Sequence, residues 1–296
     1  MTTPPSDVPL PPTAAAPRPS KDRYDFFGTS HLGMVRTENQ DCFLIGSIHK
    51  AMQVHQTSLP DDALGEMISP SRGYVFLVAD GVGGIPGGKD ASRTALTAIL
   101  DYVLRAMDLY VQLDQDLEPE FLAELQRSVE RSHEAVRKAG DADEERVGMA
   151  TTLTMVCIRW PRGYLVHVGD SRCYMLRDGE LMLLTKDQTM AQAMVDAGAL
   201  SPDQAERSGL NHILYSAIGA TRAEPMTLTT DIRAEDVMFL CTDGVTKHVS
   251  EEEIRDALRA CTSAEKTVGE LLQLVLDRGG SDNTTMILGR YKAAGE

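Results

Sequence analysis

The sequence of 296 residues is short of basic side chains, of aromatic side chains and of long apolar runs. Lys and Arg number 29 against 44 Asp and Glu, so the net charge of −15 argues against a nucleic-acid binder, which needs a basic face. The same excess of acid argues against docking on anionic lipid. No run approaches the roughly 20 apolar residues of a membrane span, and the first residues lack the pattern of a signal peptide.

Cysteine is also scarce, with five residues and no CxxC pair. Four of them lie in apolar, strand-like runs, which favours buried free thiols and a protein of the reducing cytoplasm. Aromatic residues make up only 5% of the chain, so a core must consist mainly of aliphatic side chains. The seven histidines show no zinc-binding spacing such as HExxH.

Residues 1–22 are rich in Pro, Thr and Ala without any periodicity, which is typical of a disordered or extended tail. The rest, residues 23–292, is expected to form one domain. Residues 49–72 are polar and aperiodic, and we interpret them as a loop insertion between strands.

Apolar periodicity predicts helices and strands in alternating blocks. Helices are expected at 90–110, 119–139, about 189–207, after Ser250 and at 268–277, whereas strands are expected at 24–47, 74–79, 152–160, 163–169, 172–176, 180–184, 226–232, 237–242 and 284–291. This arrangement favours an α+β fold with antiparallel sheets packed together.

Five aspartates lie where predicted strands meet loops. Asp80, Asp170 and Asp243 follow apolar strands, whereas Asp41 and Asp282 precede strands. If these strand ends converge on one edge, five carboxylates would repel each other strongly unless divalent cations offset their charge. Oxygen ligands of this kind favour Mg²⁺ or Mn²⁺ over zinc.

Simpler interpretations exist for single members of this set. An Asp-Gly pair is usually a turn, and Asp178-Gly179 is expected to be one. Ser171 could act as a nucleophile, but no histidine base is placed near it by the sequence. Cys157 and Cys241 lack the CxxxxxR pattern of a thiolate phosphatase and are expected to be buried.

The ordered set of motifs resembles the protein phosphatase 2C (PPM) family of metal-dependent Ser/Thr protein phosphatases, in its compact bacterial form. The motifs are Arg36-x-x-Asn39-Gln40-Asp41, Asp80-Gly81-x-Gly83-Gly84, Gly148-Met149-Ala150-Thr151-Thr152, Gly169-Asp170-Ser171-Arg172, Thr242-Asp243-Gly244 and Asp282-Asn283. The resemblance covers about residues 24–291. It implies a β-sandwich of two antiparallel sheets flanked by helix pairs (α-β-β-α), with two Mn²⁺ or Mg²⁺ ions at one end.

The resemblance also implies the roles of individual residues. Catalysis is expected to depend on Arg36, which binds the substrate phosphate, and on Asp80 and Asp243. Asp80 is expected to bridge both metals. The Gly81 carbonyl serves one of them, with Asp41 nearby as a ligand or as the holder of a ligand water. Asp243 and Asp282 hold the other metal, and Asp170 with Asp243 takes a weaker third ion. Asn39, Gln40 and Asn283 are expected to hold these ligands in place without contacting the metals directly.

Residues 187–219 resemble the family's flap subdomain, which borders the site. Val82 stands where some relatives have a histidine proposed as general acid, and Gln188 stands where the flap usually begins with histidine. The implied reaction is hydrolysis of phosphoserine or phosphothreonine in proteins by a metal-activated water, opposing a bacterial Ser/Thr kinase; a monomer is expected. Two alternatives are a catalytically silent phosphoprotein-binding module and a hydrolase of nucleotides or small phosphates.

Overall fold

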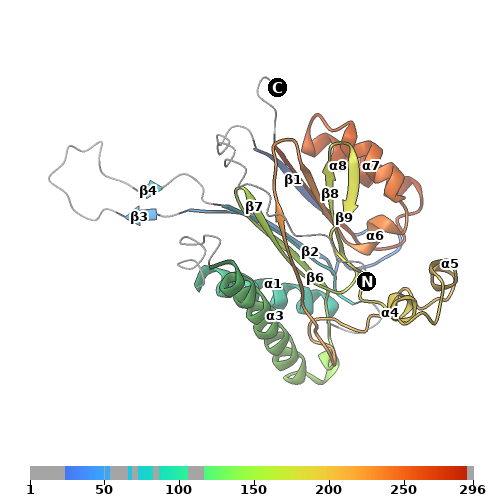
Figure 1. Cartoon of the computed structure of the whole chain (residues 1–296). Helices are drawn as coiled ribbons and strands as arrows, with labels where there is room; N and C mark the ends of the chain where they lie inside the picture. Colours follow the sequence, from blue (N-terminus) through green and yellow to red (C-terminus); the bar gives the residue numbers. More distant parts are fainter. Residues whose placement is uncertain are drawn as a thin grey trace, which may run out of the picture.

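A computed structural model describes residues 24–49, 51–53, 66–68, 73–82, 87–105 and 117–291. Two antiparallel β-sheets lie face to face, and a pair of helices covers the outer face of each sheet (Figure 1). The four layers therefore follow the order α-β-β-α, as expected. The predicted tail at 1–22 and residues 83–86 of the glycine-rich segment lie outside the described residues.

The first sheet has the strand order β1-β12-β11-β8-β9, and the second has the order β10-β7-β6-β5-β2. The strands of the first sheet are β1 (Tyr24–His31), β8 (Arg172–Arg177), β9 (Glu180–Leu183), β11 (Val237–Cys241) and β12 (Thr284–Tyr291). Those of the second are β2 (Cys42–Ile48), β5 (Gly73–Ala79), β6 (Leu153–Arg159), β7 (Arg162–Val168) and β10 (Met226–Asp231). Every neighbouring pair in both sheets is antiparallel.

Two long helices cover the second sheet and two others cover the first (Figure 1). The first pair is α1 (Gly88–Arg105) and α3 (Glu118–Asp141), and the second pair is α7 (Glu251–Arg259) and α8 (Ala264–Asp277). Helix α7 begins with a capping box, in which the Ser250 hydroxyl accepts from the Glu253 N–H and the Glu253 carboxylate accepts from the Ser250 N–H. Its buried residues, Ile254 and Leu258, are four apart and so face the sheet together.

Strand β5 shows how the layers are held together. Alternate side chains point to opposite faces of a strand, so Phe76 and Val78 enter the apolar layer between the sheets. Leu77 and Ala79 instead pack against the layer that contains α1 and α3. All seven residues of β5 are buried, which explains why its sequence is an uninterrupted apolar run.

Most predicted elements are confirmed, with three corrections. The segment 49–72 contains a short antiparallel ribbon, β3 (Ala51–Gln53) with β4 (Glu66–Ile68), so it is not only a loop. The helix expected at 189–207 is two short helices, α4 (Met190–Asp196) and α5 (Pro202–Glu206), because Ser201 and Pro202 start a new capped helix. The one-turn helix α6 (Asp243–Thr246) and the 3₁₀ turn at Glu144–Arg146 were not predicted.

Candidate metal centre

The strand ends that carry the five aspartates lie at one edge of the sandwich. Antiparallel pairing places the end of β5 against the start of β2, with Ala79 opposite Cys42. The end of β11 lies against the start of β12, with Cys241 opposite Met286. Asp80 and Asp41 therefore adjoin each other in one sheet, while Asp243 and Asp282 adjoin each other in the facing sheet. The predicted convergence is confirmed.

Asp80 is held by the Thr151-Thr152 segment through its backbone. The Asp80 N–H donates to the Thr152 hydroxyl at 3.0 Å. The Asp80 carbonyl accepts from the Thr152 N–H and the Thr151 hydroxyl, both at 2.8 Å. A side chain at Gly81 would lie 2.5 Å from the Gly88 backbone, so only glycine fits beside Asp80.

Asp41 is positioned by the loop that precedes β2. The Asn283 side chain accepts from the Gln40 N–H and donates to the carbonyls of Leu32 and Glu38, which fastens this loop to the start of β12. The Asn39 side chain accepts from the Asp41 N–H. Asn39 and Asn283 thus hold the loop that carries Asp41, and the contact with Asn283 comes from the backbone of Gln40 rather than its side chain. Their supporting roles toward a metal ion stay a prediction.

Asp243 is the first residue of the one-turn helix α6, directly after Thr242 at the N-cap position. One oxygen of Asp41 accepts from the Thr242 hydroxyl at 2.9 Å, which links the two aspartates across the sheets. A Cβ at Gly244 would overlap the Asn283 carbonyl oxygen, so glycine allows α6 to approach the Asp282 segment closely.

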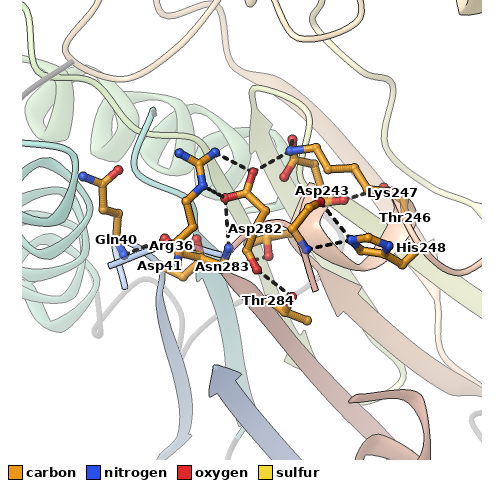
Figure 2. Close-up of polar contacts among 12 residues, drawn as sticks. Arg36, Gln40, Asp41, Asp243, Thr246, Lys247, His248, Asp282, Asn283 and Thr284 are labelled. Carbon is orange, nitrogen blue, oxygen red and sulfur yellow. Dashed lines mark hydrogen bonds and ion pairs between the residues drawn. The ribbon is translucent and has the colours of Figure 1, made fainter. Parts of the chain in front are cut away.

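Asp282 lies between two cationic side chains (Figure 2). The Arg36 guanidinium contacts both of its oxygens, at 2.7 Å from Nε and 2.9 Å from Nη2. Lys247 Nζ lies 2.7 Å from Asp282 Oδ2 and 2.7 Å from Asp243 Oδ2. Burial opposes the ionisation of Asp282, but these contacts outweigh it and lower its pKa. The predicted phosphate ligand Arg36 thus pairs here with a predicted metal ligand.

Three of the acids, Asp41, Asp80 and Asp170, have raised pKa values, and the causes show how closely the group is packed. Burial is the main cause at Asp80, whose pKa is raised well above its usual range, and the charges of the other four aspartates add to it. Burial raises the pKa of Asp41 to about 6 and that of Asp170 to about 8, with the charge of Asp243 contributing in both cases. Electrostatic repulsion therefore opposes full ionisation of this cluster.

A cavity of about 590 Å³ opens at this edge. Its lining includes Arg36, Lys247, Gly81, Gln40 and four of the five aspartates, all except Asp41. Two residues from the segment after α5, His212 and Leu214, also line it. The predicted flap therefore borders the cavity, and Gln188 anchors it by accepting from the Gly169 N–H beside Asp170.

The structure also identifies residues that the sequence analysis left without a role. Thr152 holds the backbone of Asp80. Lys247 bridges Asp243 and Asp282, and its position four residues after Asp243 was a sequence signal for the first of these two contacts. Ser171 is fully buried and bonded to the Thr152 hydroxyl, so it supports the site rather than attacking a substrate. Burial raises the pKa of the Cys157 and Cys241 thiols to about 12, which disfavours a thiolate nucleophile.

The donor chemistry of this cluster fits a hard divalent cation. Asp41 Oδ1 and Asp243 Oδ1 are buried and have no hydrogen-bond partner among the described residues. A buried carboxylate oxygen without a donor is unfavourable, and a cation would satisfy it. Over the ranges described, no three acidic, His or Cys side chains form a ready-made metal-binding group, so the individual ligands stay a prediction.

Within the described residues, no helix has the length and apolarity needed to cross a bilayer.

Residues 51–277 match the family model described as Protein phosphatase 2C. The serine/threonine protein phosphatase PstP of Mycobacterium tuberculosis is 36% identical over 72% of this chain, and the match spans 40% of that protein. The chain thus spans about two-fifths of the PstP relatives that it matches. Protein phosphatase PhpP of Streptococcus pneumoniae is 27% identical over 77% of this chain and 89% of its own length.

Solved structures share the fold over nearly the whole chain. The catalytic domain of PstP in complex with two manganese ions superposes with a TM-score of 0.69 at 30% identity. The superposition covers 92% of this chain and 99% of that domain. This coverage is wider than the family-model range of residues 51–277, which leaves out Arg36, Asp41 and Asp282.

Proposed function

Because this chain belongs to the protein phosphatase 2C family, we propose that it is a metal-dependent protein phosphatase that hydrolyses phosphoserine and phosphothreonine in other proteins. The observation that carries this proposal is the buried carboxylate cluster with two unpartnered oxygens, on Asp41 and Asp243. Relatives with this fold are named serine/threonine phosphatases, and one was solved with two manganese ions.

We take the assignment of the ligands from the resemblance to the family. Asp80 and Asp41 with the Gly81 carbonyl would hold one Mn²⁺ or Mg²⁺, and Asp243 and Asp282 with Asp80 would hold the other. Asp170, together with Asp243, would serve a weaker third ion. Such ions, when bound, activate water and offset the charge of phosphoryl oxygens.

Arg36 would bind the substrate, and the other residues near the site have supporting parts. The Arg36 fork, already paired with both oxygens of a carboxylate, has the geometry to bind two oxygens of a phosphate instead. Thr151 and Thr152 hold the Asp80 backbone in place. Val82 can move no proton, so protonation of the leaving oxygen must come from another group or from water.

The cellular setting is likewise a proposal. A phosphatase of this kind would act on the products of a Ser/Thr kinase, and phosphorylated proteins would be its substrates. Free cysteines throughout the described residues favour the cytoplasm, and we propose a monomer.

The experiment is a phosphate-release assay on a phosphothreonine peptide, with and without Mn²⁺. We expect activity only with metal, and Asp243→Asn should lower it by on the order of a thousandfold. Glu120→Gln, on the exposed face of α3, is the matched control and should leave the rate unchanged. Full turnover by Asp243→Asn, or turnover of nucleotides but not of the peptide, would contradict the proposal; metal binding without turnover would indicate a silent binding module.

A further inference from the structure

Lys247 is a cation placed among predicted metal ligands. It follows the single turn of α6, and its N–H donates to the Asp243 carbonyl at 2.9 Å, which directs its side chain back over the start of the helix. Its ammonium then lies 2.7 Å from one oxygen of Asp243 and 2.7 Å from one oxygen of Asp282 (Figure 2). The two carboxylates proposed to share a divalent ion thus already share a monovalent cation.

The surroundings make these contacts more than a surface ion pair. The side chains of Asp243 and Asp282 are only 21% and 16% exposed, and that of Lys247 is 26% exposed. Charges that are partly removed from water interact more strongly than exposed ones. A divalent ion that uses the same two oxygens must displace the ammonium first.

Displacement would leave Lys247 in a position to bind substrate. Arg36 and Lys247 contact the same carboxylate, that of Asp282, and both line the cavity. If Asp282 turns its oxygens to a metal ion, both cations lose the same anionic partner. A guanidinium fork beside an ammonium is a common arrangement for binding a phosphate.

We propose that Lys247 competes with the divalent cation for Asp243 and Asp282, and that after displacement it joins Arg36 in binding the substrate phosphate. The proposal rests on the metal site of the proposed function. It predicts effects of opposite sign for one residue: removing the ammonium should strengthen metal binding and weaken phosphate binding.

The test is calorimetric titration of the metal-depleted full-length protein with Mn²⁺, followed by titration of the manganese-loaded protein with inorganic phosphate. We expect Lys247→Met to bind Mn²⁺ about tenfold more tightly and inorganic phosphate about tenfold more weakly than the wild type. Lys247→Arg keeps the charge and should bind Mn²⁺ with nearly the wild-type affinity.

Lys186→Met is the matched control, because Lys186 also contacts an aspartate at 2.7 Å, Asp196, but does not line the cavity. Its affinities should equal those of the wild type. Unchanged or weaker Mn²⁺ binding by Lys247→Met would overturn the competition, and unchanged phosphate binding would overturn the second role. Failure of the wild type to bind Mn²⁺ at all would instead contradict the proposed function as well.

Discussion

Acidic residues gather in two regions of this molecule, at the edge of the sandwich and on the helical layer formed by α1 and α3. At the edge, five aspartates face each other, and burial raises the pKa of three of them. On the helical layer, Glu118 accepts two hydrogen bonds from Arg162 and one from Tyr164, and its pKa is lowered. The ionised form of a carboxyl group is thus destabilised at the edge and stabilised on the helical layer.

This difference separates two groups of acidic residues that both contribute to the net charge of −15. Acids on helix faces are paired or exposed to water, so they need no further partner. At the edge, Arg36 and Lys247 pair with Asp282 and Asp243, but three other aspartates are desolvated beside like charges, so their ionised forms stay unfavourable until a cation binds. The acids at the edge are therefore the ones that indicate function, whereas the acids on the helical layer, which are more numerous, mainly keep the protein soluble.

The largest effect that sharpens this comparison concerns pH and metal. The pKa of Asp170 is about 8 in the folded protein, above the ordinary value of an unfolded Asp, so the folded state binds a proton that the unfolded state releases. The stability of the metal-free protein should therefore fall as the pH rises from 6.5 towards 8.5. In this window the buried His167, whose pKa is lowered to about 4, is neutral in the folded state and contributes little.

The measurement is the melting temperature with a chelator and with Mn²⁺ at several pH values. Saturating Mn²⁺ should remove most of the fall, because bound cations favour the ionised carboxylates. Asp170→Asn should flatten the fall in the metal-free protein. If the metal-free wild type became more stable between pH 6.5 and 8.5, the pKa of the cluster would not be raised as described.

A moderate effect is expected at Thr152, which joins the two sides of the edge. Thr152→Val keeps the shape but removes the hydroxyl that accepts from the Asp80 N–H and contacts the Ser171 hydroxyl. The buried groups left without hydrogen-bond partners should cost about 1–3 kcal/mol of unfolding free energy. Because Asp80 would then be held less firmly, activity should fall roughly tenfold. Chemical denaturation and the peptide assay measure both. Thr97→Val, on the exposed side of α1, should change neither; activity retained by Thr152→Val would show that Asp80 does not need this support.

The smallest effect is expected on the helical layer of α1 and α3, which has no proposed part in metal binding or catalysis. Glu118→Gln weakens the contacts with Arg162 and Tyr164 where α3 meets β7. Because the group is partly exposed, we expect a loss of about 1 kcal/mol in unfolding free energy and no change in metal affinity or turnover. Denaturation and calorimetry check this. A clear loss of Mn²⁺ binding would mean that the two acidic regions are coupled.

Much of the fold could be predicted because its elements have strong local signals. The strand β5 is a continuous apolar run, and α3 has apolar residues at helical spacing. The Asp178-Gly179 turn was also predicted correctly, since both residues have the positive φ that this hairpin turn requires. The ribbon of β3 and β4 was missed because three-residue strands leave no periodicity to detect.

The candidate site divides in the same way. The aspartates could be found because each adjoins a strand whose pattern is clear, and pairing then brings those ends together. The spacing of four residues could have indicated the contact of Lys247 with Asp243 but not the one with Asp282, 35 residues away in the chain, because that contact depends on how α6 packs against the start of β12. His212 enters the cavity lining only through the path of the chain after α5.

The sequence by itself determined most of the segments that become strands and helices, and that five carboxylates stand at strand ends. Hydrophobic periodicity and turn chemistry act over a few residues, so they can be read along the chain. Only the tertiary structure decided which carboxylates are buried and which cations lie among them. Desolvation and charge interactions depend on distances between segments remote in sequence, and these distances exist only once the two sheets have packed.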